Sequence, residues 1–224
     1  YTQLFVKLLK TGRAGQYIIF GVNRNTLFYL ACKEKLEDIA IQLIRHGNCI
    51  PEHVNRHTNT ALMQACIFGL IHVVHNLIMS PNISIQTKIQ MVNHRDRHGI
   101  TPLMCIATIT EDLIEDGLYI SSHLFDILNT SFMDENNNKI YLLSLETLQA
   151  RFQPRRQNQG ARRNLLDEFG QTEYEDLDRP SAYDYANRNH NTFLCVSISV
   201  NIRLRQNPNV LQIDSNDFGS DMIT

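Results

Sequence analysis

A short pattern of one hydroxyl residue followed by apolar and small residues recurs along the chain. It is clearest in residues 26–32 (TLFYLAC), 60–66 (TALMQAC) and 101–107 (TPLMCIA), and residues 181–187 (SAYDYAN) repeat it nearer the C-terminus. A hydroxyl residue before an apolar run is typical of a helix N-cap, and proline, here Pro102, is tolerated at the first helical position. Each copy therefore predicts the start of a short helix.

A second apolar segment follows the first in each of the clearest copies. Residues 36–44 (LEDIAIQLI) place apolar side chains three and four positions apart, and residues 71–78 (IHVVHNLI) repeat this spacing. The spacing is the period of an α-helix with one buried face. We therefore expect a pair of helices in each copy. Small residues such as Ala65 and Cys66 would let neighbouring helices approach closely.

Polar residues that favour turns precede each hydroxyl residue. The dipeptide Val-Asn opens these segments at positions 22–23, 54–55 and 92–93, and the third segment reads VNHRDRHGIT. Because Asp and Gly are common in tight turns, each segment predicts a hairpin-like finger ahead of its helix pair.

Together these residues resemble the ankyrin repeat, whose unit runs V-N-x-x-D-x-x-G-x-T-P-L-H-x-A-A before a second helix. Residues 92–107 match this unit best, residues 43–47 (LIRHG) match the end of its second helix, and the resemblance extends over residues 26–190. Residues 5–12 (FVKLLKTG) look like the end of a repeat whose first helix is missing. The resemblance implies an all-α solenoid of stacked helix-turn-helix units with hairpin-like fingers. It also implies that Asn23, Asn55 and Asn93 brace the finger turns.

The resemblance divides the chain into seven segments. They are the end of a truncated repeat (1–25), a repeat (26–59), a repeat with an insertion (60–100), a repeat (101–139), a degenerate repeat with an Arg-rich insertion (140–180), a C-terminal capping repeat (181–206) and a tail (207–224). The degenerate copy begins at residues 140–146 (IYLLSLE). Residues 196–204 (VSISVNIRL) alternate in the manner of a strand, whereas the repeat places a helix there, and the sequence leaves both structures open. Further repeats or domains outside this chain are expected.

Composition narrows the classes of function. With 224 residues, 43% of them apolar and 20% charged, the chain has the composition of a globular protein. It lacks an apolar run long enough to cross a membrane, so we expect no membrane partner. Its formal charge of −2 gives no basic excess, and we expect no nucleic-acid partner.

The cysteines indicate a compartment. Five cysteines with no C-x-x-C spacing favour reduced thiols and a cytoplasmic location. The chain is rich in Asn and Ile, a bias that AT-rich genomes often show. If it comes from an intracellular pathogen or a large virus, the location becomes the host cytoplasm or the virion.

We find no sequence motif for catalysis or for a cofactor. The chain has no P-loop, G-x-G-x-x-G, H-E-x-x-H or G-x-S-x-G motif, so we expect no enzyme and no cofactor. Equally spaced histidines in two fingers, His53 with His57 and His94 with His98, could bind a metal ion. Solvated side chains or hydrogen bonds between the fingers are the simpler expectations, and we predict no metal site. Cys32 and Cys66 occupy equivalent positions and are expected to be small packing residues rather than nucleophiles.

A stack of repeats presents an extended surface, whose usual function is binding. We expect an adaptor or scaffold that binds a protein partner, with contacts from finger tips and first helices: Arg56, His57, Asn59, Ile67, Phe68, Arg97, His98, Ile100 and Ile109. The apolar members would either form an exposed patch or pack beneath the insertions. Alternatives are a substrate-positioning region of a larger enzyme and a structural component of a large assembly.

An arginine cluster in the second insertion is a further candidate. Arg155, Arg156, Arg162 and Arg163 could contact an anion or an acidic peptide, because guanidinium groups suit bidentate contacts with such groups. The alternative is a solvated loop paired with the acidic residues of segment 167–178.

Overall fold

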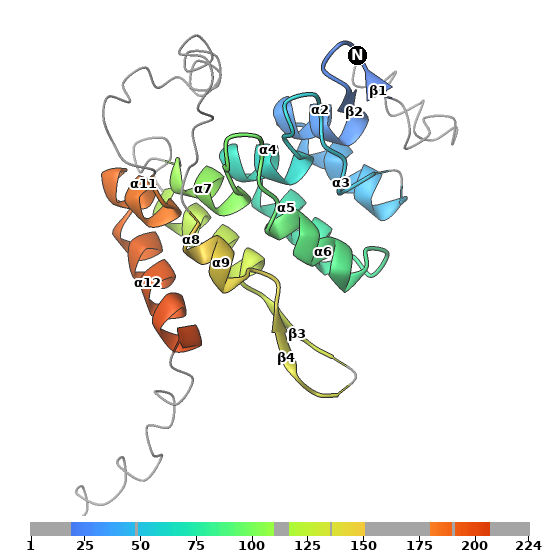
Figure 1. Cartoon of the computed structure of the whole chain (residues 1–224). Helices are drawn as coiled ribbons and strands as arrows, with labels where there is room; N and C mark the ends of the chain where they lie inside the picture. Colours follow the sequence, from blue (N-terminus) through green and yellow to red (C-terminus); the bar gives the residue numbers. More distant parts are fainter. Residues whose placement is uncertain are drawn as a thin grey trace, which may run out of the picture.

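The computed structural model describes residues 19–47, 49–109, 117–134, 136–150, 180–189 and 191–206. These segments are mostly helical (Figure 1). The expected end of a truncated repeat at residues 5–12, the arginine cluster and the tail at 207–224 all lie outside the described residues.

Short helices that follow the hydroxyl residues form one row. They are α2 (Leu27–Lys33), α4 (Ala61–Ile67), α7 (Pro102–Ala107) and α11 (Ala182–Arg188), and each packs against the next in this order. The side-chain oxygens of Thr26, Thr60, Thr101 and Ser181 each accept a hydrogen bond, 3.1 or 3.2 Å long, from the backbone N–H three residues later. The predicted hydroxyl caps are therefore confirmed at all four positions.

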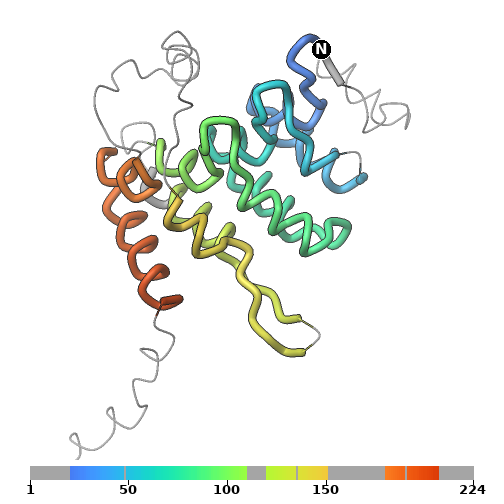
Figure 2. Tube along the Cα trace, viewed as in Figure 1, coloured from blue at the N-terminus to red at the C-terminus, as the bar shows by residue number. Residues whose placement is uncertain are grey.

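A second row of helices covers the first. It contains α3 (Glu37–Arg45), α5 (Ile71–Met79), α8 (Gly117–Leu128) and α12 (Thr192–Gln206), which also pack in chain order. Each of these helices contacts the first-row helix of its own pair. The trace shows the resulting succession of antiparallel pairs (Figure 2). The apolar core lies between the rows, and includes Leu43, Leu77, Leu124 and Ile198, all fully buried.

The C-terminal segment that the sequence left open is helical. Asn191 caps α12, because its side-chain oxygen accepts a hydrogen bond of 3.1 Å from the backbone N–H of Leu194. Its amide nitrogen donates to the hydroxyl of Ser121 on α8 at 2.6 Å. Leu194, Cys195 and Ile198 are buried at helical spacing. Packing against α8 thus decides the structure of residues 196–204, whereas their alternation of apolar and polar residues favours a strand.

In the part of the chain that the structure describes, two further helices lie outside the paired rows. Helix α6 (Ile85–Val92) lies in the first insertion, and α9 (Leu145–Leu148) follows the short hairpin of β3 (Ser131–Met133) and β4 (Lys139–Tyr141). Both begin with the same S-x-x-T sequence, in which Ser84 or Ser144 accepts a hydrogen bond from the N–H of the threonine. A second hairpin joins β1 (Ile19–Phe20) and β2 (Asn25–Thr26).

The prediction that a helix opens at Ile140 is wrong. Residues 139–141 form β4, which pairs antiparallel with β3 so that Ile140 faces Phe132. No hydroxyl residue precedes Ile140, and a helix begins only after the hydroxyl cap of Ser144. Because α11 packs directly on α7, the described segments place no helix pair between them.

Candidate protein-binding surface

The finger ahead of α4 and the finger ahead of α7 each contain a turn of the same type. The side-chain oxygen of Asn55 accepts hydrogen bonds from the backbone N–H groups of His57 and Asn59, at 2.9 and 3.0 Å. In the next finger, Asp96 Oδ1 accepts from the N–H groups of His98 and Ile100, both at 2.8 Å. Each turn is thus held by one short polar side chain that bonds two and four residues ahead.

The predicted brace of the third finger is corrected from Asn93 to Asp96. Asn93 lies at the end of α6, where its amide nitrogen donates to the carbonyl of Leu142 at 2.6 Å and its oxygen accepts from the N–H of Ser144 at 2.8 Å. It therefore ties α6 to the segment before α9. The repeated Val-Asn dipeptide therefore does not mark equivalent positions in the two fingers. Alignment on the hydroxyl caps instead superimposes residues 53–60 (HVNRHTNT) on 94–101 (HRDRHGIT), and so matches Asn55 with Asp96.

The shared turn needs a left-handed residue at its fourth position. At this position Thr58 has φ = 65° and Gly99 has φ = 79°. Glycine adopts a positive φ without steric cost. The tip of the β3–β4 hairpin repeats the turn, because Asp134 Oδ1 accepts from the N–H groups of Asn136 and Asn138 and Asn137 has φ = 63°. No helix follows this third copy of the turn, because the chain continues directly into β4.

Hydrogen bonds join each finger to the next. The N–H of Arg56 donates to the carbonyl of Asn23 at 2.8 Å, and the N–H of Arg97 donates to the hydroxyl of Thr58 at 2.6 Å. His53 Nε2 lies 2.8 Å from the carbonyl oxygen of Arg24, and His94 Nε2 lies 2.7 Å from that of Thr58. Since a carbonyl only accepts, Nε2 donates in both bonds. The fingers therefore form one bonded ladder. His53 and His94 contribute to it, which is one of the two roles that the histidine spacing leaves open.

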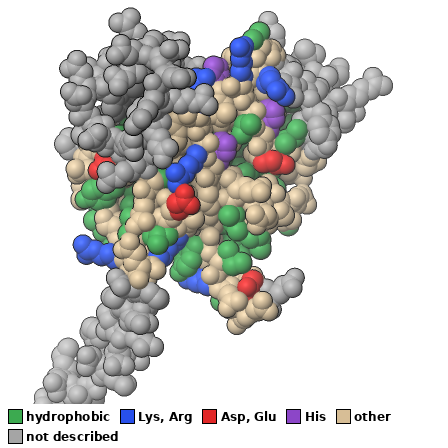
Figure 3. Space-filling model, viewed as in Figure 1, with side chains coloured by type: hydrophobic (Ala, Val, Ile, Leu, Met, Phe, Trp, Pro, Cys, Tyr) green, Lys and Arg blue, Asp and Glu red, His purple; other side chains and the backbone are tan. Residues whose placement is uncertain are grey.

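The same pair of residues occupies the tip of both fingers. Arg56 is exposed and His57 half-buried, while Arg97 and His98 are both half-buried and joined by a 2.9 Å hydrogen bond from Arg97 Nε to His98 Nε2. His side chains and several Lys or Arg side chains lie on the upper part of the face in Figure 3, and further Lys or Arg side chains lie along its lower edge. The one acid of these turns, Asp96, is buried, and burial raises the pKa of its carboxyl above the ordinary value.

Other predicted contact residues are distributed differently. Asn59 and Ile109 are only 3% and 5% exposed, so the prediction that they contact a partner is wrong. Ile67, Phe68 and Ile100 are half-buried and pack against the core, and the ammonium of Lys35 lies 5.0 Å from the centre of the Phe68 ring. These side chains therefore add a narrow apolar edge rather than an exposed patch.

The described residues offer little chemistry beyond hydrogen bonding and charge. They contain no group of three or more His, Cys, Asp or Glu side chains arranged to hold a metal ion. Cys32 and Cys66 are buried, and burial raises the pKa of each thiol far above its ordinary value. A buried neutral thiol is a poor nucleophile, which fits the expected packing role. None of the described helices has the length and apolar character needed to cross a membrane.

Comparison with known proteins adds no assignment. No protein-family model matches the sequence, and no curated protein shows significant similarity to it.

Proposed function

We propose that this chain is an ankyrin-repeat protein that binds a partner protein through its finger tips and the adjoining first helices. The packing of helix pairs in chain order supports the repeat assignment, as do the matching hydroxyl caps. The ladder between fingers is the single observation that carries the binding role, because it fixes the tip residues relative to one another.

Rigid presentation matters for affinity. Binding costs free energy when loops and long side chains become ordered, and a preformed surface lowers that cost. Here the backbone on which Arg56 and Arg97 stand is already held by bonds to the preceding finger. Arginine is among the residues that contribute most at protein interfaces. A tip row of Arg and His suits a partner surface rich in carboxylates and carbonyls.

The thiols support a cytoplasmic location for this function. All five cysteines are free and buried in the structure. Free cysteines are the ordinary state in a reducing compartment. The proposal assigns the chain no catalytic step and no cofactor.

The test is a site-directed photo-cross-linking experiment on the full chain. A photoreactive amino acid replaces His57 at the finger tip, and cross-linked proteins are identified by mass spectrometry. The same reagent at Met79, an exposed side chain of the second row, is the matched control. A protein cross-linked from position 57 but not from position 79 supports the proposal. It fails if both positions yield the same set of proteins, or if neither yields an adduct.

Binding is then compared between wild type and the double variant Arg56→Glu, Arg97→Glu. Arg45→Glu, an exposed charge reversal on α3, controls for the change in net charge. We expect the identified partner to be lost with the double variant and kept with the control.

A further inference from the structure

The last helix carries an apolar stripe on the side that faces away from the stack. Phe193, Val196 and Val200 are 63%, 56% and 44% exposed. Arg203, also exposed, continues the stripe. At about 100° per residue these positions fall on one face of α12, opposite the buried Leu194 and Ile198.

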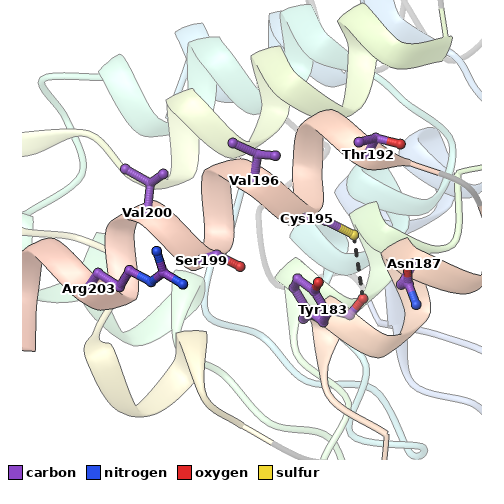
Figure 4. A pocket seen from close by; sticks show the side chains of 8 residues that line it. All are labelled: Tyr183, Asn187, Thr192, Cys195, Val196, Ser199, Val200 and Arg203. Carbon is purple, nitrogen blue, oxygen red and sulfur yellow. Dashed lines mark hydrogen bonds between the residues drawn. The ribbon is translucent and has the colours of Figure 1, made fainter.

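A groove runs beside this stripe. It has a volume of about 360 Å³ and lies between α11 and α12, with Tyr183 and Asn187 on one wall and Val196, Val200 and Arg203 on the other. Figure 4 shows that Val196 and Val200 project in the same direction from successive turns of α12. The sulfur of Cys195 contacts the carbonyl of Tyr183 at 3.8 Å and joins the two helices at the base.

This face stands at the end of the stack. In every earlier pair the corresponding side is covered by the next pair, but among the described residues no element packs against the outer side of α11 and α12 (Figure 1). The terminal unit of a repeat array normally has a polar outer side, which keeps the array soluble. An apolar stripe at this position indicates a surface that is covered in the functional state.

The order of residues along the stripe is symmetric about Ile198. Val196 and Val200 lie two residues before and after it, and Phe193 and Arg203 lie five residues before and after it. When two such helices cross antiparallel on a two-fold axis at Ile198, valine meets valine, and an aromatic ring meets a guanidinium at each end. An Arg above an aromatic face is attracted by the ring quadrupole. The stripe is therefore complementary to a second copy of itself.

We propose that the outer face of α12 is the interface of a homodimer, in which two chains pair antiparallel through this helix. Val196 packs against the partner's Val200, and Phe193 stacks against the partner's Arg203. An isologous contact of this kind buries the same patch on both chains and leaves no open end for further addition. It also leaves both rows of finger tips free, so this inference is independent of the partner-binding proposal.

The dimer is expected to be weak. One helix and one groove per chain make a small interface, and small interfaces are typical of weak, transient complexes, so we expect association in the micromolar range. Sedimentation equilibrium of the full chain between about 5 and 200 µM measures it directly. We expect the average mass to rise with concentration from the 25.9 kDa of one chain towards twice that value.

The face is tested by charge insertion. Val196→Glu with Val200→Glu is expected to hold the mass at that of one chain throughout the concentration range. Met79→Glu with Val54→Glu places the same charges on exposed apolar positions away from α12 and is expected to dimerise as wild type does. Circular dichroism confirms that each variant is folded. A wild-type chain that stays monomeric at every concentration overturns the proposal, as does dimerisation that survives the α12 charges.

The antiparallel register is tested by two opposite charges at one site. Phe193→Glu places a carboxylate against the partner's Arg203, so it is expected to keep the dimer. Phe193→Lys places two cations together and is expected to raise the dissociation constant at least about tenfold, which corresponds to about 1.4 kcal/mol. In a parallel pair, position 193 would meet its own copy, and both charges would repel equally. Equal weakening by Glu and Lys would therefore refute the register.

Discussion

The brace of the third finger offers a sharp test of the repeat geometry, because two buried oxygen atoms there lack a partner. Asp96 Oδ2 and Asn59 Oδ1 are both buried without a hydrogen bond. In the preceding finger the equivalent atoms are bonded, since Asn55 Nδ2 donates to Asn25 Oδ1 at 3.2 Å. Asn55 matches Asp96 and Asn25 matches Asn59 in the alignment on hydroxyl caps. At these aligned positions, two oxygens that only accept thus stand where the earlier pair has a donor and an acceptor.

Replacing Asp96 with Asn is therefore expected to stabilise the fold at pH 7. The amide keeps the oxygen that accepts from His98 and Ile100, and by analogy with the Asn55–Asn25 bond its nitrogen is expected to donate to Asn59 Oδ1. A buried polar group without a partner costs about 1 to 3 kcal/mol, and a hydrogen bond contributes about 1 kcal/mol net. We expect the free energy of unfolding to rise by about 1 to 2 kcal/mol. The measurement is urea unfolding followed by circular dichroism.

The gain should depend on pH. Burial raises the pKa of Asp96 in the folded chain above its ordinary value, so the protonated form favours folding. Its contribution is fully present below the ordinary pKa and is lost as the pH rises through the raised pKa. A protonated Asp96 can itself donate to Asn59, so the difference between Asp96→Asn and wild type should shrink as the pH falls from 7 towards the ordinary pKa of aspartate.

The reciprocal change is the control. Asn55→Asp removes the donor to Asn25 and creates the same pair of acceptors one finger earlier, so it should destabilise the fold at pH 7 by a similar amount. The reasoning is refuted if Asp96→Asn is no more stable than wild type at pH 7, or if its gain is the same at every pH.

Three further predictions concern the caps, the thiols and the β3–β4 hairpin. Thr60→Ala removes the acceptor for the N–H of Met63 and should lower the free energy of unfolding by about 1 kcal/mol, whereas Thr60→Ser should keep it; urea unfolding measures both. Burial raises the pKa of all five thiols, that of Cys49 to about 11. A thiol reagent at pH 8 should therefore label almost no cysteine in the folded chain and all five in urea. Rapid labelling of the native chain would contradict their burial. The guanidinium of Arg205 lies 4.2 Å from the centre of the Tyr141 ring. Tyr141→Ala should therefore speed hydrogen exchange across residues 131–141 and leave exchange in α4 unchanged. Equal exchange rates of variant and wild type in residues 131–141 would show that this contact does not hold the hairpin.

Local chemistry explains what the sequence could predict. A hydroxyl cap, a proline at the first helical position and a run of apolar residues all act within one or two turns, so the starts of α4 and α7 are encoded where they occur. The equal spacing of the histidines left open whether they are solvated or bond between fingers, and the structure shows that His53 and His94 bond to the preceding finger. Repetition thus indicates candidate long-range contacts in a single sequence.

Contacts without repetition could not be predicted. Arg205 donates to the carbonyl of Leu143 and to Asn129, far away in the chain, and no sequence spacing indicates either bond. The segment 196–204 has the alternation of a strand and is helical only because its buried residues meet α8. Lys88 of α6 is buried with its ammonium 5.2 Å from the centre of the Phe132 ring, a contact that requires the hairpin to be placed first.

The register of the third finger differs from its prediction for another reason. The Val-Asn pairs at 54–55 and 92–93 are not equivalent, because the turn is defined by its distance from the helix cap that follows it. The signal was present in the sequence, since His, Arg, His and Thr recur at matching positions of residues 53–60 and 94–101.

The central claim is that the finger tips bind a protein, and a calorimetric titration tests it most directly. The partner cross-linked from position 57 is titrated into the full chain and into Arg56→Glu, Arg97→Glu. Arginine is enriched among the few interface residues whose loss costs more than about 1 kcal/mol. With about 1 kcal/mol for each charge reversal we predict a fall in affinity of at least about thirtyfold, with Arg45→Glu unchanged. Equal affinity of the double variant and the wild type would contradict the assignment of the binding surface.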